Sequence, residues 1–343
     1  MSALADEIDA NRRVEELERT CRTLQRQVAG AKAKTADLVE AVHAGARDAA
    51  LIVGQPQPVP APKHKTGDGD EEWAVVHLTD WQLGKRCGVP GDHDYYDTEV
   101  GIARVRYVIE RVRRITEIQR KDHPVPGVVV MFGGDMVEGG GNIYALQAHE
   151  IDSSGFAQVM AASSLMAEVV LTLLQDFERV QVHSVHGNHG RLGRKGDHAR
   201  EDNLDNLAFA LARQQVAGQD RVAWPVNLAW HDHVEVGRWS ALLIHGDQIK
   251  GWSGTPAAGI ARRATAWSSS LPFEWSSMFM GHYHQRIVVT LPNGADVRMT
   301  PSTESGSQYA AELMGARGKP GQLLLYIHPD KGRVTGEYMV WLD

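Results

Sequence analysis

Five short motifs in this chain carry side chains with which proteins bind metal ions, and they follow one another in a fixed order. Their carboxylate, carboxamide and imidazole groups are the usual ligands of paired divalent cations. Nearly every motif directly follows an apolar, β-branched run, so we expect the ligands on loops at the carboxyl ends of buried strands. One such motif alone is a weak signal, whereas type, order and context together indicate a two-metal hydrolase site. The motifs are Thr79-Asp80-Trp81-Gln82, Gly133-Gly134-Asp135, Gly187-Asn188-His189, His245-Gly246-Asp247 and Gly281-His282-Tyr283-His284.

The carboxylates of Asp80 and Asp135 have different expected roles. Asp80 closes an apolar run, and a carboxylate buried there needs a cation or a strong donor, because burial alone is costly. A helix or turn cap is the alternative for Asp80. Asp135 follows Gly133 and Gly134, which leave room beside its carboxylate. It therefore suits a bridge between two cations, which repel one another unless an anion lies between them.

Asn188 and His189 are neighbours and need separate roles. The carboxamide oxygen of Asn188 is a weak ligand for a hard cation. His189 must point elsewhere, so we expect it above the metals, where it protonates the leaving oxygen or stabilises phosphate charge. An ordinary loop is the alternative for this pair.

Three further histidines supply imidazole ligands. His245 ends an apolar run, and His282 and His284 lie two apart on an extended segment, so their side chains project to the same side. A neutral histidine ligand also needs an acceptor for its second nitrogen. Asp247 is a candidate acceptor, and a surface turn residue is an equal alternative.

The order and the residues of these motifs resemble those of the calcineurin-like metallophosphoesterase superfamily over roughly residues 73–341. Asp80-Trp81-Gln82-Leu83-Gly84 is similar to the opening motif of its double-strand-break-repair nuclease branch and of phage-encoded members. The Gly-Asn-His-Gly-Arg run and the acidic helix after Ala148-His149-Glu150 look most like the phage group. The resemblance implies a four-layer αββα sandwich of two mixed β-sheets flanked by helices, with a dinuclear Mn, Fe or Zn centre. It assigns Asp80, Asp135 and His284 to the first metal, Asp135, Asn188, His245 and His282 to the second, and catalysis to His189.

Gln82 departs from the family, which usually has histidine at that place. Its amide oxygen would make the first site richer in oxygen, which favours harder ions. We therefore expect two divalent cations, with Mn²⁺ favoured over Mg²⁺, Fe²⁺ and Zn²⁺. Alternatively, Gln82 points away and the first site is filled only when substrate arrives.

Hydrophobic periodicity predicts the elements that position these motifs. Early β-α-β alternation followed by many strands indicates a mixed α/β (α+β) fold, in which two sheets pack face to face with helices outside. We expect helices over residues 98–119, 151–177 and 201–213. The expected strands are 73–78, 128–132, 180–185, 234–236, 240–244, 277–280, 286–291, 322–327 and 334–341.

Composition predicts three parts. Residues 1–53 read as an N-terminal helix with a coiled-coil seam, residues 54–71 as a Pro-rich linker, and residues 72–343 as the catalytic domain. We expect a dimer, or docking to a coiled-coil partner, through residues 4–50. One amphipathic helix lying on the catalytic domain is the alternative. The seam is formed by Val14, Leu17, Cys21, Leu24 and Val28.

Bulk properties restrict the compartment and partners. The net charge of -7 argues against a basic coat for nucleic acid. With Cys21 and Cys87 as its cysteines, the chain has no disulfide framework, which fits a reducing cytosol. Residues 1–10 lack an apolar signal core, and no apolar run approaches the roughly 20 residues that span a bilayer. We expect no membrane association and a cytoplasmic location, in a host cytoplasm if the protein is phage-encoded.

The substrate is predicted from basic and aromatic residues. Arg191, Arg194 and Lys195 follow His189 directly and suit a non-scissile phosphate, with a solvated loop as the alternative. His149, with Asn142 and Tyr144, is expected to line the cleft. Trp252 and Trp267, with Arg262 and Arg263, are suited to stack a base and hold its backbone. Burial in a core is the alternative for each tryptophan.

These features favour a metal-dependent phosphodiester hydrolase, a nuclease or nucleotide phosphodiesterase acting through a metal-activated hydroxide. One alternative is a phosphomonoesterase or cyclic-nucleotide phosphodiesterase. The other is a scaffold protein with a residual metal site, which Gln82 favours and the completeness of the other ligands opposes.

Overall fold

The computed structural model describes residues 57–342, apart from 65, 93, 142, 145–146, 251–255 and 306–317, together with Arg13, Arg19, Arg22, Thr23 and Arg26. Those five residues are helical, and the Thr23 hydroxyl donates to the Arg19 carbonyl (3.0 Å). The remaining N-terminal segment, including the predicted coiled-coil seam, lies outside the described residues, as do Asn142 and Trp252. The chain divides into two compact units, Met1–Val53 and Gly54–Asp343. The three predicted parts stay a prediction, and the fold below is that of the second unit.

Among the described residues, the first sheet has the strand order β11-β10-β1-β2-β3-β4. Strands β1 (Trp73–Leu78), β2 (Gly127–Phe132), β3 (Arg179–Ser184) and β4 (Val222–Ala223) run parallel. Strand β10 (Gly321–His328) pairs antiparallel with β1, and β11 (Arg333–Trp341) pairs antiparallel with β10 at the edge of the sheet. Every residue of β1 and β2 is buried, as in strands covered on both faces. Because β1, β2 and β3 are parallel, the three motifs that follow them begin at one edge.

The second sheet has the order β5-β6-β7-β9-β8 within the described part of the chain. It consists of β5 (His231–Val236), β6 (Trp239–Ile244), β7 (Ser277–Met280), β8 (Ile287–Thr290) and β9 (Asp296–Met299). Strands β6 and β7 are parallel neighbours. The two histidine motifs therefore also leave from a common edge.

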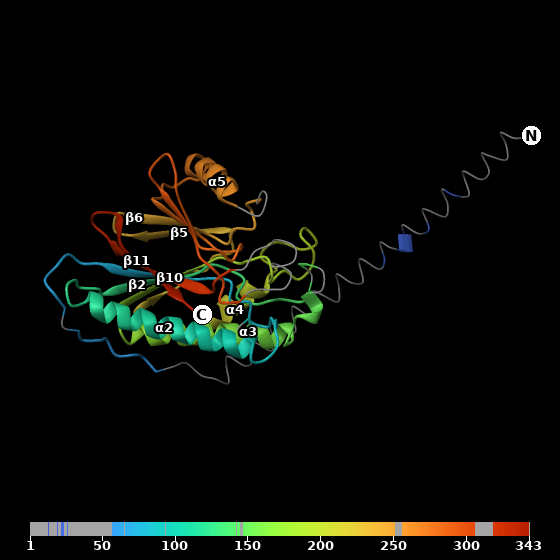
Figure 1. The fold of residues 1–343 in the computed structure, drawn as a ribbon, viewed down its shortest axis with the longest axis horizontal. Helices are drawn as coiled ribbons and strands as arrows, with labels where there is room; N and C mark the ends of the chain where they lie inside the picture. The colour runs from blue at the N-terminus through green and yellow to red at the C-terminus, as the bar shows by residue number, and fades with distance from the viewer. Residues whose placement is uncertain are drawn as a thin grey trace, which may run out of the picture. The chain divides into compact units, whose positions relative to one another are not determined.

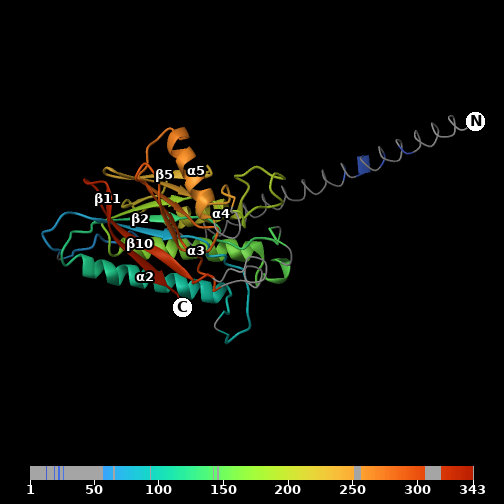
Figure 2. The same cartoon turned by 45° about the horizontal axis from the view of Figure 1, so that its top comes forward.

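Helices cover the outer face of each sheet, as Figures 1 and 2 show. Helices α2 (Thr98–Gln119), α3 (Gly155–Leu174) and α4 (Leu204–Gln215) cover the first sheet, and α5 (Ala257–Ser270) covers the second. Thr116 of α2 shares a hydrogen bond with Tyr326 of β10 (2.8 Å), and Phe209 of α4 stacks on Phe132 of β2. The sheets enclose a core that includes Val129, Trp239 and Phe279. The predicted four-layer αββα sandwich is confirmed.

The observed boundaries differ from the predicted ones where local capping decides. Helix α3 begins at Gly155 because the Ser154 hydroxyl accepts the amide of Ala157. Helix α4 begins at Leu204 because Asn203 is its N-cap. Helix α5 was not predicted, since its fully buried positions are only Ile260 and Ala264. Strands β4 and β9 and the 3-10 helix Gln147–His149 were also not predicted.

Among the described helices, only α3 has the length and apolar composition that a membrane-spanning helix needs. Most of its surface is buried within the unit, where it packs on α4 and β3. This is the pattern of a core helix in a folded domain.

Residues 57–64 and 66–71, the described part of the predicted linker, belong to this unit and contact the rest of it. The Arg221 guanidinium donates to the carbonyls of Val59 and Pro60 (both 3.0 Å). The Gln219 side chain accepts the Val59 amide (2.9 Å) and donates to the Gln57 carbonyl (3.0 Å). Since Gln219 and Arg221 directly precede β4, the segment is fastened at the amino-end edge of the first sheet.

Candidate metal centre

Ligands from both sheets meet at the carboxyl ends of the strands. His245 Nε2 lies 3.0 Å from Asp135 Oδ2 and 3.1 Å from Asn188 Oδ1. The ligand atoms of Asp135, His245 and His282 all lie within 4.8 Å of one another, and no other described set of three or more His, Cys, Asp or Glu side chains is grouped in this way. The four residues expected around the second metal are therefore neighbours in space.

The residues expected around the first metal also meet. His284 Nε2 lies 3.3 Å from Asp80 Oδ1 and 3.1 Å from Gln82 Nε2. Gln82 is fully buried within this group, and its Oε1 has no hydrogen-bond partner among the described residues. A buried acceptor without a partner, beside a carboxylate and an imidazole, fits a cation site. Rotation of the amide exchanges its oxygen and nitrogen, so Gln82 can present oxygen on either side.

Backbone strain is concentrated on the same residues. A positive φ is unfavourable for residues other than glycine and costs on the order of 1–3 kcal/mol each. Every described non-glycine residue with positive φ is one of the predicted ligands. They are Asp80 (53°), Gln82 (47°), Asp135 (53°), His282 (72°) and His284 (55°).

Glycines in two motifs allow each carboxylate to approach a neighbouring loop. A Cβ atom on Gly187 would overlap the carboxylate and amide nitrogen of Asp135. A Cβ atom on Gly281 would overlap Oδ2 of Asp80. Each glycine therefore belongs to one ligand motif and makes room for a ligand of another.

We expect Gly187→Ala to weaken divalent-metal binding by more than ~10-fold, because the added methyl group displaces Asp135. Isothermal titration with Mn²⁺ measures the affinity. Gly155→Ala is the control, since its Cβ would make only an ordinary contact with Leu204 (3.5 Å). Equal affinities for wild type and Gly187→Ala would contradict the close approach.

The histidine ligands are poised to bind through one nitrogen. His245 Nδ1 lies 2.9 Å from the Gly133 carbonyl, which leaves Nε2 for a cation. Asp247 is therefore not the acceptor for His245, and it accepts instead from Arg191 (2.5 Å). Burial would lower the pKa of His245, but Asp135 outweighs it and raises the pKa to about 10. A bound cation would replace that proton. Burial, with His245, lowers the pKa of His282 to about 4, so its imidazole is neutral.

His189 lies beside the ligands and is held by Glu138. Its Nε2 is 3.9 Å from Asp135 Oδ2, and its Nδ1 is 3.0 Å from the buried Glu138 carboxylate. The backbone amide of His189 donates to Asp135 Oδ1 (2.7 Å). Burial would lower the pKa of His189, but Glu138 and Asp135 raise it to about 9, an effect that bound cations would oppose.

Glu138 was not predicted, although it follows Asp135 by three positions on the same loop. Gln147 donates to it (2.7 Å) and also lies 3.3 Å from His189 Nδ1. The Tyr144 hydroxyl donates to Glu138 (3.2 Å). His149, predicted to bind substrate, is exposed at the end of the 3-10 helix, and no described hydrogen bond joins it to the ligands.

Asp205 is a second residue that sequence reasoning missed. Its carboxylate accepts the backbone amides of Asp135 (2.8 Å), Met136 (3.0 Å), Val137 (3.3 Å) and Gly187 (2.8 Å). It therefore ties together the loops that carry two ligand motifs. Burial, with the charge of Asp135, raises its pKa to about 6. In the sequence, Asp205 resembles an ordinary acidic residue in the first turn of a helix.

We expect Asp205→Ala to lower the free energy of unfolding by about 3–5 kcal/mol, the scale for removing one partner from a buried charged network. The reason is that four buried amides lose their common acceptor. Urea unfolding measures the change, with the exposed Asp220→Ala as control. A change for Asp205→Ala no larger than for the control would show that other groups hold these loops.

The predicted phosphate-binding residues Arg191, Arg194 and Lys195 line a pocket of about 760 Å³ beside these loops. Trp267 of α5 and Arg263 also line it. Arg262 is exposed and is not among the lining residues.

No family model and no curated protein matches this chain. Among solved structures, it is similar to Entamoeba histolytica Vps29 complexed with zinc (13% identity, 79% of this chain and 99% of that chain covered, TM-score 0.36). It is also similar to a dimetal phosphatase from Danio rerio (10%, 79% and 99%, TM-score 0.41). A putative 5'-nucleotidase from Staphylococcus aureus is a third (13%, 79% and 54%, TM-score 0.37). These identities and TM-scores are low, so the function is inferred from the geometry of the site.

Proposed function

We propose that this protein is a metal-dependent phosphoester hydrolase of the calcineurin-like type, with phosphodiesters of nucleic acids or nucleotides as substrates. The observation that carries the proposal is the strained backbone. Five ligand residues from loops of both sheets are held with left-handed φ, a cost that a purely structural loop has no reason to bear.

The donor set fits two divalent cations. Asp80, Gln82 and His284 would hold one, and Asn188, His245 and His282 the other, with Asp135 between them. When bound, such cations lower the pKa of a water molecule and neutralise phosphate charge. The many oxygen donors favour Mn²⁺ or Mg²⁺ over Zn²⁺.

His189 supplies acid and hydrogen-bonding chemistry to this centre. Glu138 fixes the ring through Nδ1, so Nε2 faces the ligand cluster on the side of Asp135. From there, Nε2 is placed to donate a hydrogen bond to a phosphate oxygen and a proton to the leaving oxygen. The amide of His189 also holds Asp135 in place.

A diester is favoured over a monoester because basic side chains lie beyond the reacting centre. Arg191 directly follows the loop of Asn188 and His189, and Asp247 holds its guanidinium. A diester carries a second group past the scissile phosphorus, and a flanking phosphate there would meet Arg191 and Lys195.

One assay separates the candidate functions. Purified protein is given Mn²⁺, Mg²⁺, Fe²⁺ or Zn²⁺ with single- and double-stranded DNA, bis-p-nitrophenyl phosphate and p-nitrophenyl phosphate. We expect hydrolysis of DNA and of the diester. Hydrolysis of the monoester alone would favour a phosphomonoesterase, and inactivity with every metal would favour a scaffold with a residual site. Self-association through residues 4–50 and a cytoplasmic location remain proposals that rest on the sequence.

A further inference from the structure

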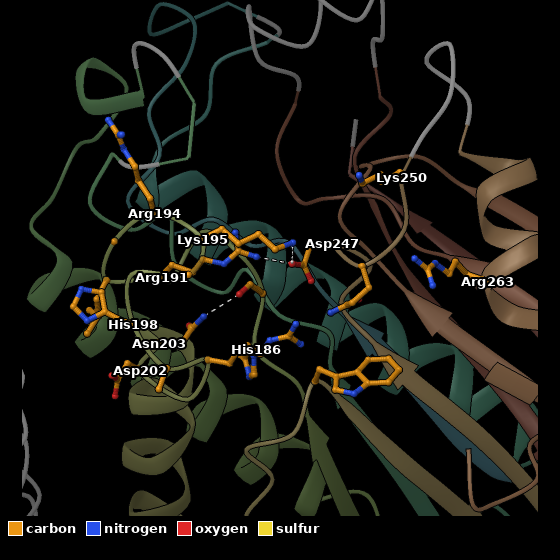
Figure 3. A pocket seen from close by; sticks show the side chains of 18 of the residues that line it. His186, Arg191, Arg194, Lys195, His198, Asp202, Asn203, Asp247, Lys250 and Arg263 are labelled. Atoms are coloured by element: carbon orange, nitrogen blue, oxygen red, sulfur yellow. Dashed lines mark hydrogen bonds and ion pairs between the residues drawn. The ribbon is translucent and has the colours of Figure 1, made fainter. Parts of the chain in front are cut away.

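The pocket beside the metal centre has walls from three places in the fold (Figure 3). One wall is the loop after β3, which begins at His186 and Gly187. Another is the turn after β6, which includes Asp247 and Lys250, and the third is α5. Gly187 abuts Asp135, and Asp247 follows the ligand His245 by two residues. The pocket therefore starts at the ligands expected around the second metal.

The lining is strongly cationic in a chain whose net charge is -7. Figure 3 shows Arg191 and Lys195 reaching toward Asp247, with Lys250 and Arg263 on the opposite side. No described carboxylate forms an ion pair with Lys250 or Arg263. Lys250 and Arg263 can therefore bind an anion. The cationic lining residues are Arg191, Arg194, Lys195, Arg200, Lys250 and Arg263, against the acidic Asp202 and Asp247.

Aromatic surface lies next to these cations. Trp230, just before β5, and Trp267 of α5 pack with ring centroids 5.2 Å apart. Both are partly buried against the core beside α5, and the part left exposed lines the pocket. Arg263 and Trp267 are four residues apart on α5 and therefore share one helix face. A cation beside an indole is the arrangement that binds a nucleotide, because the indole stacks on the base and the cation binds phosphate.

We infer that this pocket binds an unpaired nucleotide that flanks the scissile phosphodiester. Its base stacks on Trp267 beside Trp230, and its phosphate is held by Arg263 and Lys250. The pocket's volume of about 760 Å³ lies within the ~300–1,000 Å³ usual for ligand sites. A base inside a duplex is already stacked on both faces, so the pocket selects single strands or frayed ends. That the bound nucleotide flanks a scissile bond rests on the proposed function, whereas the binding site itself does not depend on catalysis.

Binding without metal tests the inference. The full chain in EDTA is titrated into a fluorescein-labelled single-stranded oligonucleotide, as DNA and as RNA, and into the matching duplex, and anisotropy is recorded. We expect the single strand to bind more tightly than the duplex. Trp267→Ala should weaken single-strand binding by about 5- to 100-fold, with Trp267→Phe retaining most of the affinity. Arg263→Ala should make the slope of log K against the logarithm of the salt concentration shallower by about 0.7. Substitution of its neighbour, Arg262→Ala, should leave that slope unchanged.

The outcomes separate this inference from the proposed function. Unaltered single-strand binding by folded Trp267→Ala and Arg263→Ala overturns the inference, as does equal or tighter binding of the duplex. Phosphodiester hydrolysis without oligonucleotide binding also overturns it and leaves the hydrolase standing. Binding that depends on Trp267, without hydrolysis under any metal, supports the pocket and rejects the hydrolase. If Trp267→Ala does not fold, Arg263→Ala against Arg262→Ala carries the comparison, and the DNA and RNA arms identify the sugar.

Discussion

Asp135→Asn is expected to reduce phosphoester hydrolysis by more than ~100-fold, beyond the 10–100-fold cost of losing a residue that only supports a metal ligand. The substitution removes the negative charge between the two proposed cation sites and keeps the shape of the side chain. The asparagine oxygen can still accept the His189 amide, which Asp135 Oδ1 accepts at 2.7 Å. The fold should therefore remain while turnover is lost, as measured by hydrolysis of bis-p-nitrophenyl phosphate with Mn²⁺.

Thermal unfolding provides an independent measure for the same variant. A ligand that binds only the folded state raises its stability by mass action, by about 2.7 kcal/mol at a hundred times the Kd. Mn²⁺ should thus raise the melting temperature of wild type and fail to do so for Asp135→Asn. Asp330→Asn, at an exposed turn far along the chain, is the matched control. Near-normal turnover by folded Asp135→Asn would reject Asp135 as the bridging ligand.

His189→Ala is expected to lower kcat by about 10²–10⁴-fold, the usual contribution of a positioned proton donor. The imidazole makes no hydrogen bond to a predicted metal ligand among the described residues, and its nearest one is Asp135 Oδ2 at 3.9 Å, so metal affinity should change little. The measurable signature is a dependence on the leaving group. An oligonucleotide, whose leaving alkoxide is strongly basic, should lose more activity than bis-p-nitrophenyl phosphate, whose leaving phenolate needs little protonation.

Glu138→Gln is the partner variant for this test. It keeps the side-chain shape beside Gln147 but removes the charge that faces His189 Nδ1. We expect a smaller loss than for His189→Ala, with the same dependence on the leaving group. An equal loss on both substrates for His189→Ala would argue that His189 only binds phosphate.

That the predicted ligands would meet in space could be inferred from the sequence, because they follow strong local patterns. An apolar run before Asp80 or Asp135 indicates a buried strand, and parallel strands bring their carboxyl ends to one edge. The same reasoning placed the histidine motifs after β6 and β7. The predicted sandwich of two sheets with outer helices also followed from the order of these runs.

The residues that hold the ligands were not predictable in the same way. Asp205 and Glu138 act through space, on amides and a ring that approach them only in the folded chain. Helix α5 was missed because few of its positions are apolar and buried, so its periodicity is weak. A left-handed glutamine or histidine has no sequence signal, since glycine or asparagine is the usual occupant of that conformation.

The left-handed backbone of the five predicted ligand residues also bears on whether this centre is functional or residual. Proteins have a margin of about 5–15 kcal/mol between folded and unfolded states, and each strained position uses part of it. Once a centre no longer serves a purpose, substitutions that relax such positions improve stability at no functional cost, and drift accumulates them. In this chain, Asp80, Gln82, Asp135, His282 and His284 all keep the strained conformation. Five strained positions in one cluster argue against a residual centre and support the proposed metal binding.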